Sequence, residues 1–160
     1  MQLRFLQKNK EEKDMIIAVA GSGGKTTRVH KLAQYYRSLG KKVFVTTTTH
    51  MKKESDTVIP ENIEDIRKQL NETGYCMAGM PATPENALVQ KIGPLPEDFY
   101  ETAVKEADIT LIEADGSRGM PAKIPADYEP VIHENIDEIH IVIGMSALGK
   151  PASKLSLIHI

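Results

Sequence analysis

Met15-Ile16-Ile17-Ala18-Val19-Ala20-Gly21-Ser22-Gly23-Gly24-Lys25-Thr26-Thr27 is the stretch that decides the fold. Its apolar first half predicts a buried parallel strand over 15–20. Apolar residues at helical spacing follow, and they predict a helix over 26–39 that ends at Gly40. The order strand, glycine loop, helix suits a phosphate group, because glycine amides can converge on an anion and the helix N-terminus adds partial positive charge.

This order predicts a P-loop that binds phosphate. Lys25 would reach the β- and γ-phosphates, and the Thr26 hydroxyl would sit on Mg²⁺. The usual pattern places glycine where this chain has Val19, so the loop is a shorter form, similar to the ATP loop of the Mur ligases. A glycine-rich turn that binds no nucleotide is the alternative. We expect the loop to face the surface, so that Lys25→Ala would abolish nucleotide affinity and leave the fold intact. The residues expected to bind the nucleotide are Gly21, Ser22, Gly23, Gly24, Lys25, Thr26 and Thr27.

The rest of the chain continues to alternate strands and helices. Strands are expected over 43–48, 109–113 and 139–143, helices over 60–74 and 96–107, and two short strands around the turn at 81–84 within 75–92. This alternation predicts an α/β fold of the P-loop NTPase type, with a mainly parallel sheet covered by helices on both faces. One domain over 1–160 is expected, with a charged N-terminal arm over 1–13.

Composition excludes several classes of protein. A net charge of −2 argues against binding to nucleic acid. The basic clusters at 8–13, 41–42 and 52–53 are expected on the solvent-exposed surface. The longest apolar runs are too short to cross a membrane. The single cysteine, Cys76, excludes an internal disulfide framework and is expected in the core. We therefore expect a cytoplasmic protein that binds neither nucleic acid nor membrane.

Two acids follow the strand over 109–113. Open α/β sheets bind ligands beyond the carboxyl ends of their strands, so the residues after each strand should meet at one edge. Glu113 and Asp115 are two residues apart and would point the same way. One could hold Mg²⁺ and the other could orient the attacking water. We favour Asp115 for the metal with Glu113 as its partner, and the reverse assignment stays open. Acids that merely end a strand before a glycine turn are the alternative.

Polar residues also follow the strand over 43–48. Four consecutive threonines, Thr46 to Thr49, precede His50. Threonine suits a strand, but hydroxyls at a strand end can also contact Mg²⁺ or a γ-phosphate, and we assign Thr48 to the metal. His50 could relay a proton. Further along, Arg118 and Lys123 lie in a loop rich in glycine and proline, where a guanidinium could hold phosphate oxygens or an anionic substrate.

Four motifs together resemble the YqeC-type family: AGSGGKTT over 20–27, VTTTTHM over 45–51, EADGSRGMPAK over 113–123, and YEPVI over 128–132. The resemblance covers about 15–151 and fades after Ala152, so the segment over 153–160 is expected to be a truncated or altered end. It implies a P-loop accessory factor for a selenium-dependent molybdenum hydroxylase, with that enzyme or its cofactor intermediates as partner. By position it also implies that Lys25 and Thr26 bind phosphate and Mg²⁺, with Asp115 and Glu113 as the acidic pair.

Three functions remain open at this point. The first is an accessory factor that binds ATP or GTP with Mg²⁺ and hydrolyses it slowly, with catalytic roles for Lys25, Glu113, Asp115, His50 and Arg118. The second is a Mur-ligase-like enzyme or a small-molecule kinase. The third is a nucleotide-binding module without turnover, which the absence of glycine at Val19 keeps open. The sequence contains no N-K-x-D motif, which argues against a G-domain.

Overall fold

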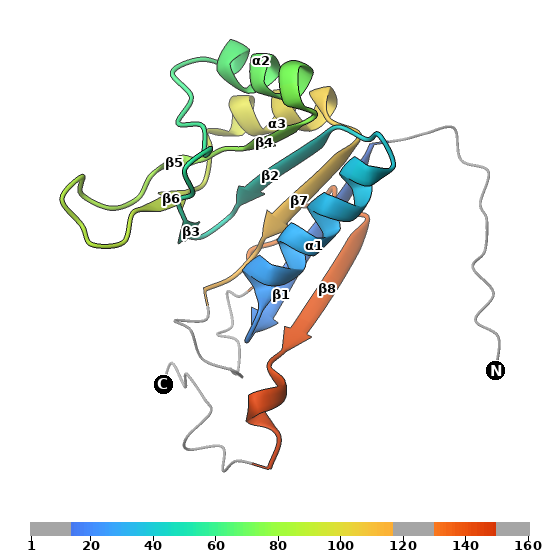
Figure 1. The fold of residues 1–160 in the computed structure, drawn as a ribbon, viewed down its shortest axis with the longest axis vertical. Helices are drawn as coiled ribbons and strands as arrows, with labels where there is room; N and C mark the ends of the chain where they lie inside the picture. Colours follow the sequence, from blue (N-terminus) through green and yellow to red (C-terminus); the bar gives the residue numbers. More distant parts are fainter. Residues whose placement is uncertain (1–13, 117–129, 150–160) are drawn as a thin grey trace.

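A computed structural model of the chain describes residues 14–116 and 130–149. Its centre is a five-stranded sheet in which every neighbouring pair is parallel (Figure 1). This confirms the predicted α/β class. The strands, in their order across the sheet, are β4 (Tyr75–Met77), β2 (Val43–Thr47), β7 (Ile109–Glu113), β1 (Met15–Ser22) and β8 (Glu138–Ile143).

Helices cover both faces of this sheet. Helix α1 (Lys25–Ser38) packs Val29, Leu32 and Ala33 against the face that carries Ile17 and Leu111. Helices α2 (Ile63–Thr73) and α3 (Glu97–Glu106) cover the face that carries Phe44, Ile16 and Ile112. Because successive strand residues point to opposite faces, odd and even positions of β1 and β7 serve the two layers. Strands β1, β2, β4 and β7 are buried on both sides, as expected for a parallel sheet, whereas the edge strand β8 is not.

Local signals explain where the helices begin and end. Asn62 caps α2: its side chain accepts from the Glu64 N–H at 3.0 Å, and Asp65 accepts from the Asn62 N–H at 3.2 Å. Gly74 ends this helix in the left-handed region at φ 68°. Helix α1 ends one residue before the predicted Leu39 and is followed by Gly40 at φ 76°.

The segment over 75–92 contains two short strands around the predicted turn and one strand more than predicted. Tyr75–Met77 forms β4 and joins the main sheet, where three residues are too few to show a period of two in the sequence. Two further short strands, β5 (Met80–Pro81) and β6 (Lys91–Gly93), form a separate antiparallel sheet with β3 (Met51–Lys52), in which β6 is central and pairs with both β3 and β5. This small sheet extends outward beyond the end of β2 (Figure 1).

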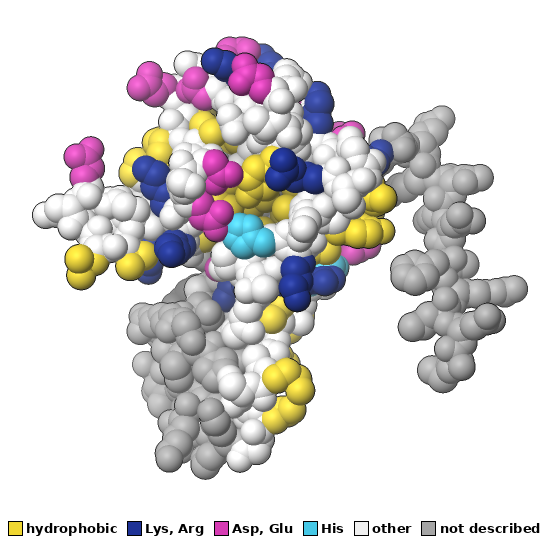
Figure 2. Space-filling model, in the orientation of Figure 1, with side chains coloured by type: hydrophobic (Ala, Val, Ile, Leu, Met, Phe, Trp, Pro, Cys, Tyr) yellow, Lys and Arg dark blue, Asp and Glu magenta, His cyan; other side chains and the backbone are white. Residues whose placement is uncertain are grey.

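Strand β8 lies at the edge of the main sheet and is the most exposed of its strands. On one face, Val142 packs against the α1 layer. On the other face, the side chains of Ile139, Ile141 and Ile143 are exposed, with Ile141 at 64%. Figure 2 shows hydrophobic side chains at the surface where Figure 1 places β8 and the following 3-10 turn η1 (Met145–Ala147). The edge strand therefore presents an apolar stripe to solvent.

Candidate functional site

The loop between β1 and α1 exposes a row of backbone amides. Gly21, Gly23 and Gly24 have φ angles of 97°, 79° and 128°, which side chains strongly disfavour. A Cβ at Gly21 would lie 2.2 Å from the carbonyl oxygen of Val142. The N–H groups of 25–27 have no acceptor within the described part of the chain, and the first turn of α1 contains no acidic residue. These amides form an anion-binding nest at a helix N-terminus.

Lys25 lies inside this loop and is only 3% exposed. Its ammonium donates to the Gly21 carbonyl at 2.7 Å and forms an ion pair with Asp115 Oδ1 at 3.0 Å. Asp115, 1% exposed, also accepts from the Gly21 N–H at 2.9 Å through Oδ2. The loop faces the surface at Gly23 and Gly24, as expected, but folding buries the Lys25 side chain against the carboxylate that follows β7, so Lys25 also contributes to the fold.

Glu113 is the carboxylate that stands beside the P-loop hydroxyl. Its Oε2 accepts from Thr26 Oγ1 at 2.9 Å, and the residue is 6% exposed. Burial raises the pKa of Glu113 above its ordinary value, although the Thr26 hydrogen bond and the Lys25 charge act in the opposite direction. Because both oxygens of Asp115 face the glycine loop, the geometry favours Glu113 over Asp115 as the carboxylate available to a cation at Thr26.

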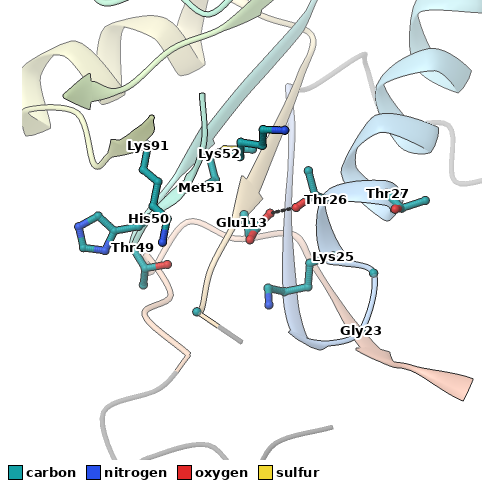
Figure 3. Close-up of a pocket in the computed structure, with 12 residues that line it drawn as sticks. Gly23, Lys25, Thr26, Thr27, Thr49, His50, Met51, Lys52, Lys91 and Glu113 are labelled. Atoms are coloured by element: carbon teal, nitrogen blue, oxygen red, sulfur yellow. Dashed lines mark hydrogen bonds between the residues drawn. The ribbon is translucent and has the colours of Figure 1, made fainter. Parts of the chain in front are cut away.

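A pocket of about 590 Å³ opens between the P-loop and the small antiparallel sheet (Figure 3). Glu113 and Gly116 line its floor from the end of β7. Such a volume suits a small-molecule ligand. The other lining residues are Gly23, Gly24, Lys25, Thr26 and Thr27 on one side, and Thr49, His50, Met51, Lys52 and Lys91 on the other.

One known protein family matches most of the chain. Residues 17–159 match the family described as "YqeC protein". The chain belongs to the YqeC family. This confirms the resemblance seen in the sequence, and the match continues past Ala152 to residue 159.

Two curated proteins illustrate the similarity. The chain is 31% identical over 163 residues to "Uncharacterized protein YqeC" of Escherichia coli (strain K12), covering 89% of this chain and 57% of that protein. It is 30% identical over 145 residues to "Signal recognition particle 54 kDa protein" of Hyperthermus butylicus, covering 89% of this chain and 29% of that protein. This YqeC-family chain thus matches little more than half the length of the first relative and less than a third of the second. No solved structure matches it.

The threonines over 46–49 differ in their contacts, and Thr49 is the one that lines the pocket. Thr47 donates to the Glu113 carbonyl at 2.8 Å and accepts from the Thr49 N–H, which ties the end of β2 to the end of β7. Thr48, assigned to the metal, donates to the Val131 carbonyl at 2.8 Å and is not among the residues that line the pocket. Thr49 does line it, and its buried hydroxyl has no partner within the described residues.

The other predicted residues are placed as follows. His50 lines the pocket, but its ring points away from Lys25 and Thr26 (Figure 3). Arg118 and Lys123 lie outside the described residues. Cys76 is fully buried, as expected of a core residue, and burial raises the pKa of its thiol to about 12. The described helices all lack the combination of length and apolarity needed to cross a membrane.

Sequence reasoning missed three residues around the pocket. Lys52 was assigned to solvated surface and Lys91 carried no signal, yet both line the wall opposite the P-loop. His30, one turn after Thr26 on α1, pairs with Glu54 at 2.8 Å. Helical spacing from Thr26 could have placed His30 near the site, whereas the lysines come together only through pairing between strands far apart in sequence.

Proposed function

We propose that this chain binds a magnesium nucleoside triphosphate at its P-loop. The observation that carries the proposal is the hydrogen bond of 2.9 Å between Thr26 and Glu113, beside amides that have no acceptor in the described chain. A hydroxyl and a carboxylate from adjacent strands and loops are the oxygen ligands that Mg²⁺ takes next to bound phosphates. The amides would hold the phosphate oxygens, and Lys25 would balance their charge.

The residues present fit a magnesium ion that is held jointly with a nucleotide. No group of three or more His, Cys, Asp or Glu in the described ranges could hold a metal by itself. Mg²⁺ commonly takes one or two protein oxygens and completes its shell with phosphates and water. Thr26 and Glu113 would supply the protein ligands, and the ion would supply charge neutralisation at the phosphates.

The ion pair of Lys25 with Asp115 suggests how nucleotide binding would change the structure outside the P-loop. A triphosphate competes with Asp115 for the ammonium group, so binding exchanges one anion partner for another. Asp115 is also bonded to Gly21 and immediately precedes Gly116 and the segment that contains Arg118. We infer a nucleotide-controlled accessory factor with slow hydrolysis, and we assign it to maturation of a selenium-dependent molybdenum hydroxylase on the family resemblance.

A ligase or kinase that resembles the Mur enzymes is the second candidate. The specific observation in its favour is the pair of lysines, Lys52 and Lys91, on the wall opposite the P-loop, where an acceptor could bind. A module that binds nucleotide without turnover is the third, because Val19 occupies the position of the usual first glycine. Phosphate release without an acceptor supports the first function, strict dependence on an acceptor supports the second, and binding without release supports the third.

The test of binding compares a threonine of the pocket with a threonine outside it. Calorimetry with ATP, GTP and CTP, with and without Mg²⁺, should show Mg²⁺-dependent affinity that falls at least about tenfold in Thr26→Val, since this variant loses a hydroxyl that contacts both the cation and Glu113. Thr102→Val is the control, because Thr102 lies on α3 and does not line the pocket. Equal loss in both variants, or no binding to the parent chain, would reject the proposal.

A further inference from the structure

Two lysines face each other across the strands that form the far wall of the pocket. Lys52 of β3 pairs directly with Lys91 of β6 in the antiparallel register, so both side chains lie on the same face of the small sheet. Figure 3 shows Lys52 extending toward Thr26 and Lys91 toward Thr49. Figure 2 shows Lys or Arg side chains at the surface where Figure 1 places these strands.

This arrangement is electrostatically unfavourable by itself. Like charges directly opposite each other on paired strands destabilise the pairing. Neither lysine forms an ion pair with a residue in the described ranges, whereas the nearby Glu54 is engaged by His30 at 2.8 Å. An anion bound in the pocket beside this wall would offset the positive charge of both exposed side chains.

The positive charge of the far wall is separate from that of the P-loop. Lys25 is already neutralised by Asp115 at 3.0 Å, and Glu113, the carboxylate among the described lining residues, is bonded to Thr26. The far wall also carries the buried Thr49 hydroxyl, which lacks a partner within the described residues and is available to a ligand oxygen. The pocket therefore has a second polar, cationic end opposite the P-loop. Both ends open into the same volume of about 590 Å³.

We propose that Lys52, Lys91 and Thr49 form a subsite for a second, small anionic ligand that carries a carboxylate or phosphate group. The Lys91 ammonium group, which extends toward Thr49 in Figure 3, holds the anion directly, the threonine hydroxyl donates to one of its oxygens, and Lys52 adds positive charge to the same wall. The role of this ligand as an acceptor or effector beside the nucleotide rests on the proposed function. The existence of the anion site rests only on the pocket and its charges.

The test titrates two simple probes, inorganic phosphate and citrate, into protein saturated with Mg²⁺ and a non-hydrolysable triphosphate, so that the P-loop is already filled. Backbone amide shifts of 49–52 and 91 report binding. In Lys52→Gln/Lys91→Gln, the affinity for the favoured probe should fall at least about tenfold. Lys53→Gln is the matched control, because Lys53 is exposed next to Lys52 and does not line the pocket.

Each outcome decides the proposal. Probe affinity that is unchanged in the double variant, or that falls equally in Lys53→Gln, overturns the subsite. Loss of triphosphate affinity in the double variant, with no separate probe binding, assigns the lysines to the nucleotide and also overturns it. If the parent chain binds no triphosphate, the proposed function fails, and the same titration on nucleotide-free protein still decides whether the lysines bind an anion.

Discussion

Replacing Lys25 with methionine should destabilise the protein even in the absence of nucleotide. The side chain is 3% exposed and its charge is paired with Asp115, which is 1% exposed, at 3.0 Å. Methionine retains an apolar stem of similar length but removes the ammonium group. The change therefore removes the ammonium partner of a buried carboxylate, which keeps its hydrogen bond from the Gly21 N–H at 2.9 Å.

The size of the effect follows from the cost of an unpaired buried charge. Breaking a buried ion pair on one side typically costs about 3–5 kcal/mol. Because the Gly21 amide still solvates Asp115, we expect the lower end, about 3 kcal/mol, or roughly 6–12 °C in Tm for a domain of this size. Adding Asp115→Asn removes the stranded charge and keeps an acceptor for Gly21, so the double variant should recover about half of the loss or more.

Urea unfolding followed by circular dichroism measures these free energies. Lys31→Met, on the exposed side of the same helix, is the control and should change stability by no more than about 0.5 kcal/mol. The reasoning is refuted if Lys25→Met behaves like Lys31→Met, or if the Asp115→Asn change adds a further loss instead of restoring stability. Nucleotide binding by Lys25 variants must accordingly be measured below their unfolding transition.

Three more outcomes are expected. Burial raises the pKa of Glu113, so over part of the pH range the folded chain holds a proton on this carboxyl that the unfolded chain has lost. The free energy of unfolding should therefore decline as pH rises from the ordinary glutamate range through the raised pKa. Glu113→Gln should remove that decline when thermal unfolding is measured between about pH 4 and about pH 8. Equal pH slopes would contradict this. Gly21→Ala should cost about 3 kcal/mol or more in urea unfolding, because its Cβ meets the Val142 backbone at 2.2 Å, whereas Gly40→Ala, with nothing within 4 Å, should cost about 1–2 kcal/mol from its positive φ alone. A thiol reagent should label Cys76 at neutral pH only as fast as the chain opens, since burial raises the thiol pKa to about 12; immediate labelling of native protein would exclude this burial.

The fold was predictable wherever one element carried its own periodic signal. The strand over 109–113 was predicted to the residue, and α1 within one residue at each end, because apolar spacing, glycine loop and Gly40 all agree. The small sheet was not predictable, since β3 and β5 have two residues each and are defined only by their partners in β6. Pairing of this kind leaves no local pattern in the sequence.

Part of the candidate site could be predicted from the sequence, but the pairing of its residues could not. The P-loop and both acids were identified in the sequence. Their spacing alone could not show that Glu113 lies beside Thr26 and Asp115 beside Lys25. The structure distinguishes them because Glu113 is the last residue of β7 and Asp115 lies two residues beyond it, next to Gly21. The opposed lysines depend on strand register and could be found only in three dimensions.

The position of β8 next to β1 links the outer edge of the sheet to the glycine loop. Gly21 and Ser22 pair with Val142 and Ile143, so the first residues of the loop are part of the ladder that holds the edge strand. Detachment of the edge strand would therefore release one side of the nest, and hydrogen exchange at these paired amides should rise and fall together. A molecule that binds the isoleucines of β8, or that displaces this strand, therefore acts directly beside the glycine loop.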